Sequence, residues 1–315
     1  MRIAILDDFN HWAKQFAQWD HANSLDFEFF SDHLTDSEAL IERLLPFDGI
    51  GLMRERTPFP AAIVERLPRL QCLVTTGMAN ASIDLNACKR QGIVVSGTES
   101  PGHATAELAF LLILAQIRRL VPLMTGHLDG QWQTELGQDC RGKTLGIVGL
   151  GRLGGQLAVL GHAIGMRVIA WSPNLTPERC LPHKVDWVSK ETLFTEADVV
   201  SIHMKLSERT RHLIGLEELS SLGPRGYLVN TSRADLVDPA ALLEALDRNL
   251  IRGCATDVYE TEPTPLLDRL VQHPKTLCTP HIGYCTEETF RVFYPQMLEA
   301  FLAFQRGQPI RVISP

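Results

Sequence analysis

Three side chains of chemically distinct types each come shortly after a short apolar run that is typical of a buried strand: Arg233, Glu262 and His281. Arginine presents a planar fork of N–H donors that matches a carboxylate. Histidine carries a proton near neutral pH, and a nearby carboxylate favours its charged form. A cation for a carboxylate, a proton donor for a carbonyl oxygen and an acid that tunes this donor are what hydride transfer to a 2-keto acid requires.

Taken singly, each of these residues also has a structural interpretation. Arg233 is compatible with a surface arginine, His281 with a histidine bonded to the backbone, and Glu262 before Pro263 with a turn. Their joint placement after successive strands favours a site, because open α/β sheets bind ligands at the carboxyl ends of their strands.

A glycine-rich turn, Gly149-Leu150-Gly151-Arg152-Leu153-Gly154, follows the predicted strand 145–148 and opens a predicted helix. This G-x-G-x-x-G spacing has the strand before it and the helix after it that a dinucleotide site needs. The first glycine permits the turn, the second lets the backbone approach a pyrophosphate, and the third lets the helix pack on the strand. We expect the coenzyme contacts of this turn to come from Gly149, Gly151, Arg152, Leu153 and Gly154.

The residue that should discriminate NAD from NADP is Ser172, at the end of the next predicted strand, 167–171. An acid at this position would bind the ribose hydroxyls and repel a 2′-phosphate, whereas serine does not repel either group. Pro173 and Asn174 follow in place of an arginine, and the nearest cations are Arg152 and Arg179. The sequence therefore predicts use of both NAD and NADP, with a preference below about a hundredfold, ~2.7 kcal/mol.

Apolar runs alternate with amphipathic stretches along the chain, which is typical of parallel sheets covered by helices. In the N-terminal part we predict strands over 3–6, 49–53, 72–75 and 93–95 and helices over 37–45 and 60–67. A second series of strands is predicted over 145–148, 167–171, 199–203, 226–230, 253–257 and 277–279. Three further segments are a buried apolar helix over 104–120, a polar stretch over 126–139 and a closing helix over 286–307.

The chain resembles the D-isomer-specific 2-hydroxyacid dehydrogenases over nearly its full length. The matching segments are GLGRLG at 149–154, SIHMKLSERTRHLI at 201–214, NTSRADLVD at 230–238, ATDVYETEP at 255–263 and TPHIG at 279–283. The resemblance implies an α/β fold in which a Rossmann-type doubly wound sheet, residues 101–284, is inserted into a smaller flavodoxin-like domain. The smaller, substrate-binding domain would comprise residues 1–100 and 285–315.

The resemblance also implies roles for individual residues. Arg233 would bind the substrate carboxylate and carbonyl, His281 would be the acid/base, and Glu262 its partner. Glu260 is a second candidate acid, but the acid directly before the proline fits the family pattern. Further coenzyme contacts are expected from Ser172, His203, Thr231, Asp257, which would hold the nicotinamide carboxamide, and Thr105.

The substrate loop of the family resembles residues 76–84, so Met78 and Ala79 are expected to contact substrate. The loop departs from the usual pattern at Ala79 and Asn80, and Lys205 replaces a proline that commonly follows the His203 pair. Arg54 follows a predicted strand and is expected either to reach the substrate or to lie at the surface. Glu107 is expected to be an anchor facing the site or a charge favoured by the helix dipole.

Bulk properties narrow the class of protein. The length of 315 residues favours two domains. A net charge of −7 with no basic cluster, and the absence of a signal peptide or long apolar run, argue against nucleic-acid and membrane partners. Seven scattered cysteines favour free thiols in the cytoplasm and no metal site. The family resemblance implies a homodimer, with residues 118–138 as part of the interface.

Two alternatives to a reductase of glyoxylate, hydroxypyruvate or a related 2-keto acid remain at this point. One is a dinucleotide-sensing regulatory protein on the same fold, as in the C-terminal-binding-protein corepressors. The other is a relative that oxidises formate or phosphite. A phosphoglycerate dehydrogenase with an added regulatory domain is not expected, since no such segment follows the closing helix.

Overall fold

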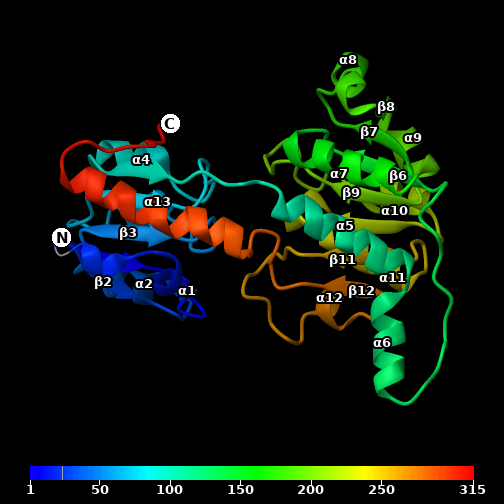
Figure 1. The fold of residues 1–315 in the computed structure, drawn as a ribbon, viewed down its shortest axis with the longest axis horizontal. Helices are drawn as coiled ribbons and strands as arrows, with labels where there is room; N and C mark the ends of the chain where they lie inside the picture. The colour runs from blue at the N-terminus through cyan, green and yellow to red at the C-terminus, as the bar shows by residue number, and fades with distance from the viewer. Residues whose placement is uncertain (23) are drawn as a thin grey trace. The chain divides into compact units, whose positions relative to one another are not determined.

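The computed structural model describes residues 1–22 and 24–315, which fold as two compact units. Unit 1 consists of Met1–Pro101 and Cys285–Pro315, and unit 2 is Gly102–Tyr284. The chain therefore leaves unit 1 once and returns to it near its C-terminal end (Figure 1).

Unit 1 is built on a parallel five-stranded sheet with the order β2-β1-β3-β4-β5, which is the flavodoxin-like order. The strands are β1 Arg2–Ile5, β2 Asp26–Phe29, β3 Gly49–Leu52, β4 Cys72–Thr75 and β5 Val94–Gly97. The helices are α1 Trp12–Phe16, α2 Ser37–Leu44, α3 Ala61–Val64, α4 Leu85–Arg90 and α13 Glu287–Gln305.

The two faces of this sheet are covered differently. Apolar side chains of α2, α3 and α4 form one core cluster with the strands. On the other side α13 packs so closely that a Cβ on Gly51 would lie 2.7 Å from the sulfur of Met297. Side-chain caps begin two of the helices, because Asp36 accepts from Ala39 N and Asp84 accepts from Ala87 N, both at 2.8 Å.

Unit 2 is built on a seven-stranded parallel sheet with the order β12-β11-β10-β9-β6-β7-β8. Its strands are β6 Thr144–Val148, β7 Arg167–Trp171, β8 Asp186–Trp187, β9 Val199–Ile202, β10 Tyr227–Asn230, β11 Gly253–Thr256 and β12 Thr276–Cys278. Its helices are α5 Ala104–Ile117, α6 Leu120–Leu128, α7 Arg152–Ala163, α8 Pro177–Cys180, α9 Lys190–Glu196, α10 Leu216–Leu222, α11 Pro239–Asp247 and α12 Arg269–Gln272. The expected doubly wound fold is confirmed.

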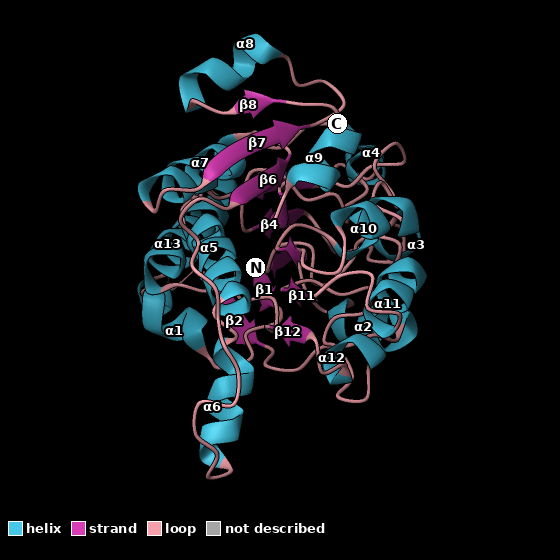
Figure 2. Ribbon diagram, turned by 90° about the vertical axis from the view of Figure 1, so that its right-hand side faces the viewer, coloured by secondary structure: helices cyan, strands magenta, loops and turns pink. Residues whose placement is uncertain are grey.

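The chain enters this sheet in the middle, at β6, and winds first toward β8 and then toward β12. The strand order therefore reverses between β6 and β9, which is where such sheets bind their ligands. Figure 2 shows α5 and α7 on one face of the sheet and α9, α10 and α11 on the other. The carboxyl ends of β9, β10, β11 and β12 lie side by side, because Asn230 pairs with Ile202 and Thr256, and Thr256 pairs with Cys278.

The single helix predicted over 104–120 is wrong. The chain forms α5 and then α6, and the break falls at Arg119, whose φ is 54°. The predicted polar stretch over 126–139 accordingly begins inside α6. Burial of α5 is also incomplete, because Leu111 is 55% exposed.

Smaller differences have local causes. The edge strands β2 and β8 were not predicted: β2 carries acids at its alternate exposed positions, and β8 has two residues. The helix expected over 60–67 ends at Val64 and continues as turns with Arg66 N→Ile63 O and Leu67 N→Val64 O bonds. Pro68 disfavours helical backbone at the residue before it.

Among the described residues, no single helix is long and apolar enough to cross a membrane. The pair α5 and α6 reaches such a length together, with a bend of 64° between them. The same residues contain no group of three His, Cys, Asp or Glu side chains arranged to hold a metal ion.

Candidate active site

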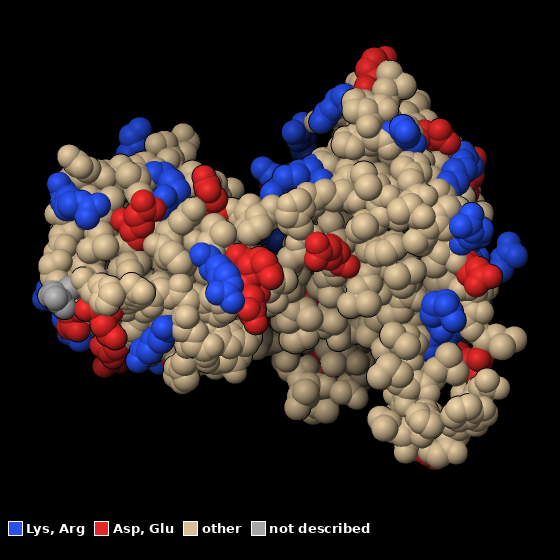
Figure 3. Space-filling model, viewed as in Figure 1, with Lys and Arg blue, Asp and Glu red and all other residues tan. Residues whose placement is uncertain are grey.

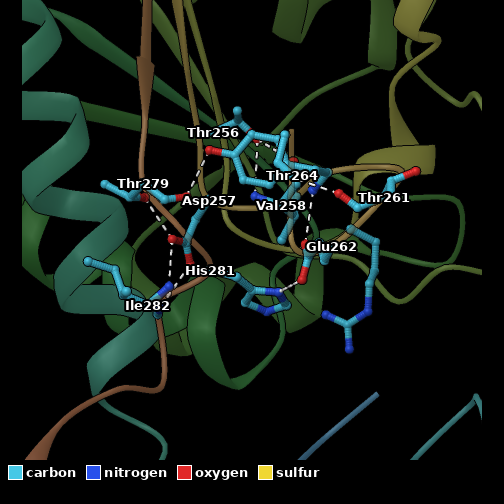
Figure 4. A network of polar contacts seen from close by, with 12 residues as sticks. Thr256, Asp257, Val258, Thr261, Glu262, Thr264, Thr279, His281 and Ile282 are labelled. Atoms are coloured by element: carbon cyan, nitrogen blue, oxygen red, sulfur yellow. Dashed lines mark hydrogen bonds and ion pairs between the residues drawn. The ribbon is translucent and has the colours of Figure 1, made fainter. Parts of the chain in front are cut away.

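The histidine and the acid singled out in the sequence are in direct contact. His281 Nδ1 and Glu262 Oε2 form a hydrogen bond beyond the carboxyl ends of β11 and β12 (Figure 4). The second carboxylate oxygen of Glu262 accepts from Tyr259 N at 3.0 Å, which fixes the orientation of the acid. Nδ1 is thus engaged with the acid, and proton exchange through Nε2 stays a prediction.

The backbone around His281 is held in an uncommon conformation, with a φ of 54° at His281 itself. Asp257, which is 1% exposed, accepts from Thr279 Oγ1 at 2.6 Å and from the backbone N of Ile282 and Gly283 at 2.8 Å each. Figure 4 shows this carboxylate beside the loop that carries the imidazole. Asp257 therefore positions the histidine loop, and burial raises the pKa of its carboxyl. A contact from Asp257 to the nicotinamide stays a prediction.

Arg233 comes directly after the turn that ends β10, and a side chain of that turn fixes its backbone. Asn230 Nδ2 donates to Arg233 O at 2.8 Å, while Asn230 Oδ1 accepts from Ser232 N at 3.0 Å. The guanidinium donates from Nη1 to Ser232 O at 2.6 Å. The sequence marks Asn230 as part of a matching segment, but its role as the residue that shapes the turn is visible only in the structure.

Arg233, Glu262 and His281 thus follow the neighbouring strands β10, β11 and β12, whose ends are in register. An arginine and a histidine paired with a carboxylate form a set that can hold an anion and transfer a proton beside it. The roles of Arg233 in substrate binding and of His281 as acid/base stay predictions.

The glycine turn after β6 has the geometry that a dinucleotide requires. Gly149 has a φ of +101°, and a Cβ there would lie 2.5 Å from His203 O. A Cβ on Gly154 would meet Gly149 O, which shows how closely α7 approaches the turn. Around Gly151 nothing lies within 4 Å of where a Cβ would be, so backbone is open to a ligand at the start of α7.

Two polar atoms near this turn are buried and lack a hydrogen-bond partner among the described residues: His203 Nδ1 and Thr231 Oγ1. The other ring nitrogen of His203 contacts Ser201 Oγ at 2.9 Å. Unpaired buried polar atoms are rare in folded proteins, so both atoms fit a site that a polar ligand completes. A contact of either atom with the coenzyme stays a prediction, and the groups present fit NAD or NADP.

Burial lowers the pKa of His203 to about 4, so the ring is neutral at neutral pH. An unfolded chain takes up this proton near pH 6.5, so protonation of His203 costs the folded protein roughly 3 kcal/mol more than the unfolded chain. We expect the free energy of unfolding of the ligand-free protein to fall as the pH drops from 6.5 to 4. The variant His203→Asn should lose less stability over that window in urea titrations. His212→Asn, at an exposed histidine, is the control, and an equal effect of both variants would contradict the assignment.

Thr105 and Glu107 lie in the first turn of α5. Thr105 Oγ1 donates to Gly283 O at 2.8 Å, which ties α5 to the loop after His281. Glu107 is exposed, in agreement with a charge favoured by the helix dipole.

The candidate substrate residues of unit 1 belong to one connected structure. Arg54 has a φ of 54°, and a Cβ on Gly77 would lie 2.7 Å from its Nη1. Arg54 therefore covers the start of the loop that contains Met78, which is 47% exposed, and the exposed Ala79.

Asn80, where the sequence departs from the family pattern, holds this loop together. Its Nδ2 donates to Arg54 O at 2.5 Å and to Thr75 Oγ1 at 2.9 Å, and its Oδ1 accepts from Ser82 N at 2.9 Å. The departure thus has a structural reason, because this buried side chain joins the ends of β3 and β4.

Comparisons with known proteins agree with this geometry. A family model described as "D-isomer specific 2-hydroxyacid dehydrogenase, NAD binding domain" matches residues 110–283. A glyoxylate reductase of Korarchaeum cryptofilum is 34% identical over 281 residues, which cover 86% of this chain and 83% of that protein. A hydroxypyruvate reductase of Thermotoga maritima is 32% identical over 274 residues, covering 85% and 88%.

A crystal structure of a phosphoglycerate oxidoreductase from Vibrio cholerae has the same fold. It is 34% identical in sequence, superposes with a TM-score of 0.92, and the match covers 98% of this chain and 99% of that chain.

Proposed function

The chain belongs to the D-isomer-specific 2-hydroxyacid dehydrogenase family, as an NAD(P)-dependent oxidoreductase of small 2-keto acids, and we propose that glyoxylate and hydroxypyruvate are its preferred substrates. The observation that carries the proposal is the His281–Glu262 pair after β11 and β12, with Arg233 after the neighbouring strand β10. Relatives named for reduction of glyoxylate and hydroxypyruvate support the choice of substrates.

In this proposal Arg233 binds the substrate carboxylate and polarises the carbonyl that is to be reduced. A guanidinium suits both tasks, because its fork of donors spans two oxygens and its charge is permanent. Negative charge grows on the carbonyl oxygen during reduction, so a cation beside it stabilises the transition state more than the ground state.

His281 donates a proton from Nε2 to the same oxygen as the new C–H bond forms, and takes it back in the oxidation direction. Glu262 stabilises the protonated ring through Nδ1 and keeps Nε2 directed at the substrate. The coenzyme, when bound, supplies or accepts the hydride. Gly151, Thr231 and His203 are proposed to hold it, and Asp257 to keep the histidine loop in place.

The test is an absorbance screen at 340 nm with NADH and NADPH against a panel of 2-keto acids. The panel should include glyoxylate, hydroxypyruvate, pyruvate and 4-methyl-2-oxopentanoate, with formate and phosphite as oxidation substrates. We expect turnover of glyoxylate or hydroxypyruvate to exceed that of pyruvate and of 4-methyl-2-oxopentanoate. Coenzyme binding without turnover of any substrate would support the dinucleotide-sensing alternative in place of a reductase.

We also infer that the protein is a homodimer that contacts its partner through residues 118–138. Six large apolar side chains of this segment are exposed, at 41% or more: Leu120, Val121, Met124, Leu128, Trp132 and Leu136. Apolar patches of this kind on a polar surface mark interaction sites. A cytoplasmic location belongs to the same proposal, and the seven free cysteines support it.

A charge placed in this patch should dissociate the dimer. We expect sedimentation of the wild-type protein at micromolar concentration to give a dimer and Leu128→Glu to give a monomer. Leu181→Glu, at a 73% exposed leucine outside the segment, should leave the dimer intact. A wild-type monomer, or the same effect from both variants, would contradict the assigned interface.

A further inference from the structure

We infer that Arg179, together with Ser172, forms the subsite for the 2′-phosphate of NADP(H), and that Arg152 does not. The inference rests on the proposed coenzyme site and names the residue that decides which coenzyme it accepts. In the sequence, Arg152 and Arg179 are equivalent candidates, since neither stands at the position directly after β7.

The structure separates the two arginines. The guanidinium of Arg152 lies over Gly102, in the space that a Cβ on this glycine would occupy, with Nη2 2.8 Å from that position. Gln156, one turn further along α7, contacts His103 at 3.1 Å, so this side of the helix faces residues 102–103. Arg152 is therefore directed toward the start of unit 2 and is placed at the glycine turn, where the pyrophosphate is expected.

Arg179 instead folds back over the loop that follows β7. Its Nη1 donates to Asn174 O at 3.3 Å, two residues beyond Ser172. In a Rossmann-type sheet the adenosine ribose lies at this strand end, and the 2′-oxygen is read by the residues that follow it. Arg179, on α8, thus lies against the loop after β7 that reads the 2′-oxygen. The loop itself contains Pro173 and Asn174 at the usual arginine positions.

The backbone that carries Arg179 is anchored. Leu175 and Cys180 are 6% and 1% exposed and belong to the core of unit 2. Trp187 Nε1 donates to Leu175 O at 3.0 Å, and Leu175 N donates to Ser172 O at 3.1 Å. Cys180 is buried in the core, whereas the adjacent Arg179 side chain is exposed.

The charges near this loop favour a phosphate. Arg167, on β7, is neutralised by ion pairs to Asp186 and Glu196 at 3.2 and 2.7 Å. None of the ion pairs of the described residues uses Arg179, which is bonded to a carbonyl. Glu178 is the opposing charge, and a hydrogen bond from the Thr176 side chain lowers the pKa of its carboxyl. Figure 3 shows Lys and Arg side chains gathered beside α7 and α8 on this face of unit 2.

A planar guanidinium binds a phosphate through two N–H donors, and Ser172 can add a hydroxyl without repelling it. The subsite would therefore bind the 2′-phosphate of NADP(H). NAD(H), which has a hydroxyl at that position, would make one contact fewer and would not be repelled. The expected result is use of both coenzymes, with Arg179 responsible for the NADP(H) part.

The experiment measures binding of two adenosine fragments, 5′-AMP and adenosine 2′,5′-bisphosphate, to the full chain by calorimetry. We expect the bisphosphate to bind more tightly to the wild-type protein. Arg179→Ala should lower the affinity for the bisphosphate by about tenfold or more, which is ~1.4 kcal/mol. The same variant should change the affinity for 5′-AMP by less than about twofold. Ser172→Asp should also lower only the affinity for the bisphosphate, whereas Arg152→Ala should lower the affinities for both fragments alike.

Arg225→Ala is the matched control, because Arg225 is an exposed arginine just before the amino end of β10, whereas Ser172 follows the carboxyl end of β7. The inference is overturned if Arg179→Ala changes the affinities for both fragments equally or changes neither affinity. It is also overturned if Arg152→Ala alone removes the preference for the bisphosphate. Failure of both fragments to bind the folded wild-type protein would overturn the proposed coenzyme site as well.

Discussion

Replacement of His281 by alanine should lower turnover by roughly a hundredfold or more while the affinity for coenzyme stays near normal. The reason is that His281 is the proposed proton donor to the substrate, whereas the proposed coenzyme contacts come from other residues. Turnover is followed at 340 nm, and coenzyme affinity by fluorescence titration. His21→Ala, at an exposed histidine of unit 1, should leave both quantities unchanged.

The pH profiles should report the same proton. Ketone reduction requires protonated His281 and should decline as the pH rises, whereas alcohol oxidation requires the neutral ring and should increase. In Glu262→Gln the imidazole loses its neighbouring carboxylate, so turnover should fall while the affinity for coenzyme stays near normal. The side chains of His281 and Glu262 are 23% and 17% exposed, so solvent screens their interaction only in part. Unchanged turnover in Glu262→Gln would reject the functional pairing.

Replacement of Arg233 by alanine should both raise the Michaelis constant for keto acids and slow turnover. Two effects are expected because, in the proposed mechanism, the same cation binds the carboxylate in the ground state and stabilises the developing oxyanion. Loss of binding alone would raise the Michaelis constant and leave turnover intact. Steady-state kinetics with glyoxylate and with hydroxypyruvate separate the two quantities.

Lysine at position 233 should rescue the alanine variant only in part, since a point charge cannot replace a planar fork. Arg248→Ala provides the control, because Arg248 is an exposed arginine paired with Glu244 on α11. Normal kinetics in Arg233→Ala would mean that Arg233 is a surface residue and would remove it from the proposed site.

The sequence by itself determined the fold class and the kind of chemistry. Strand segments such as 72–75 and 167–171 are predicted with the bounds that the structure has, because buried parallel strands are short continuous apolar runs. The Gly149–Gly154 turn is recognisable because its spacing follows from local requirements of a turn, a ligand and helix packing. Arg233, Glu262 and His281 are found because each comes within six residues of the end of such a strand.

Only the tertiary structure decided how these residues are held. Asp257 accepts from the backbone of Ile282 and Gly283, which lie 25 and 26 residues further along the chain. No local sequence pattern specifies these hydrogen bonds. The same holds for Asn80, which reaches back to Arg54, and for Asn230, whose bonds shape the turn before Arg233.

The helix break at Arg119 and the direction of Arg179 are of the same kind. Periodicity predicts one helix through residue 120, because an apolar stretch satisfies helical packing on either side of a bend. The positions of Arg152 and Arg179 are equivalent in the sequence and differ only once Gly102 and the Ser172–Asn174 loop are packed beside them. Long-range packing selects among local conformations of similar energy, and local sequence patterns do not predict which conformation is selected.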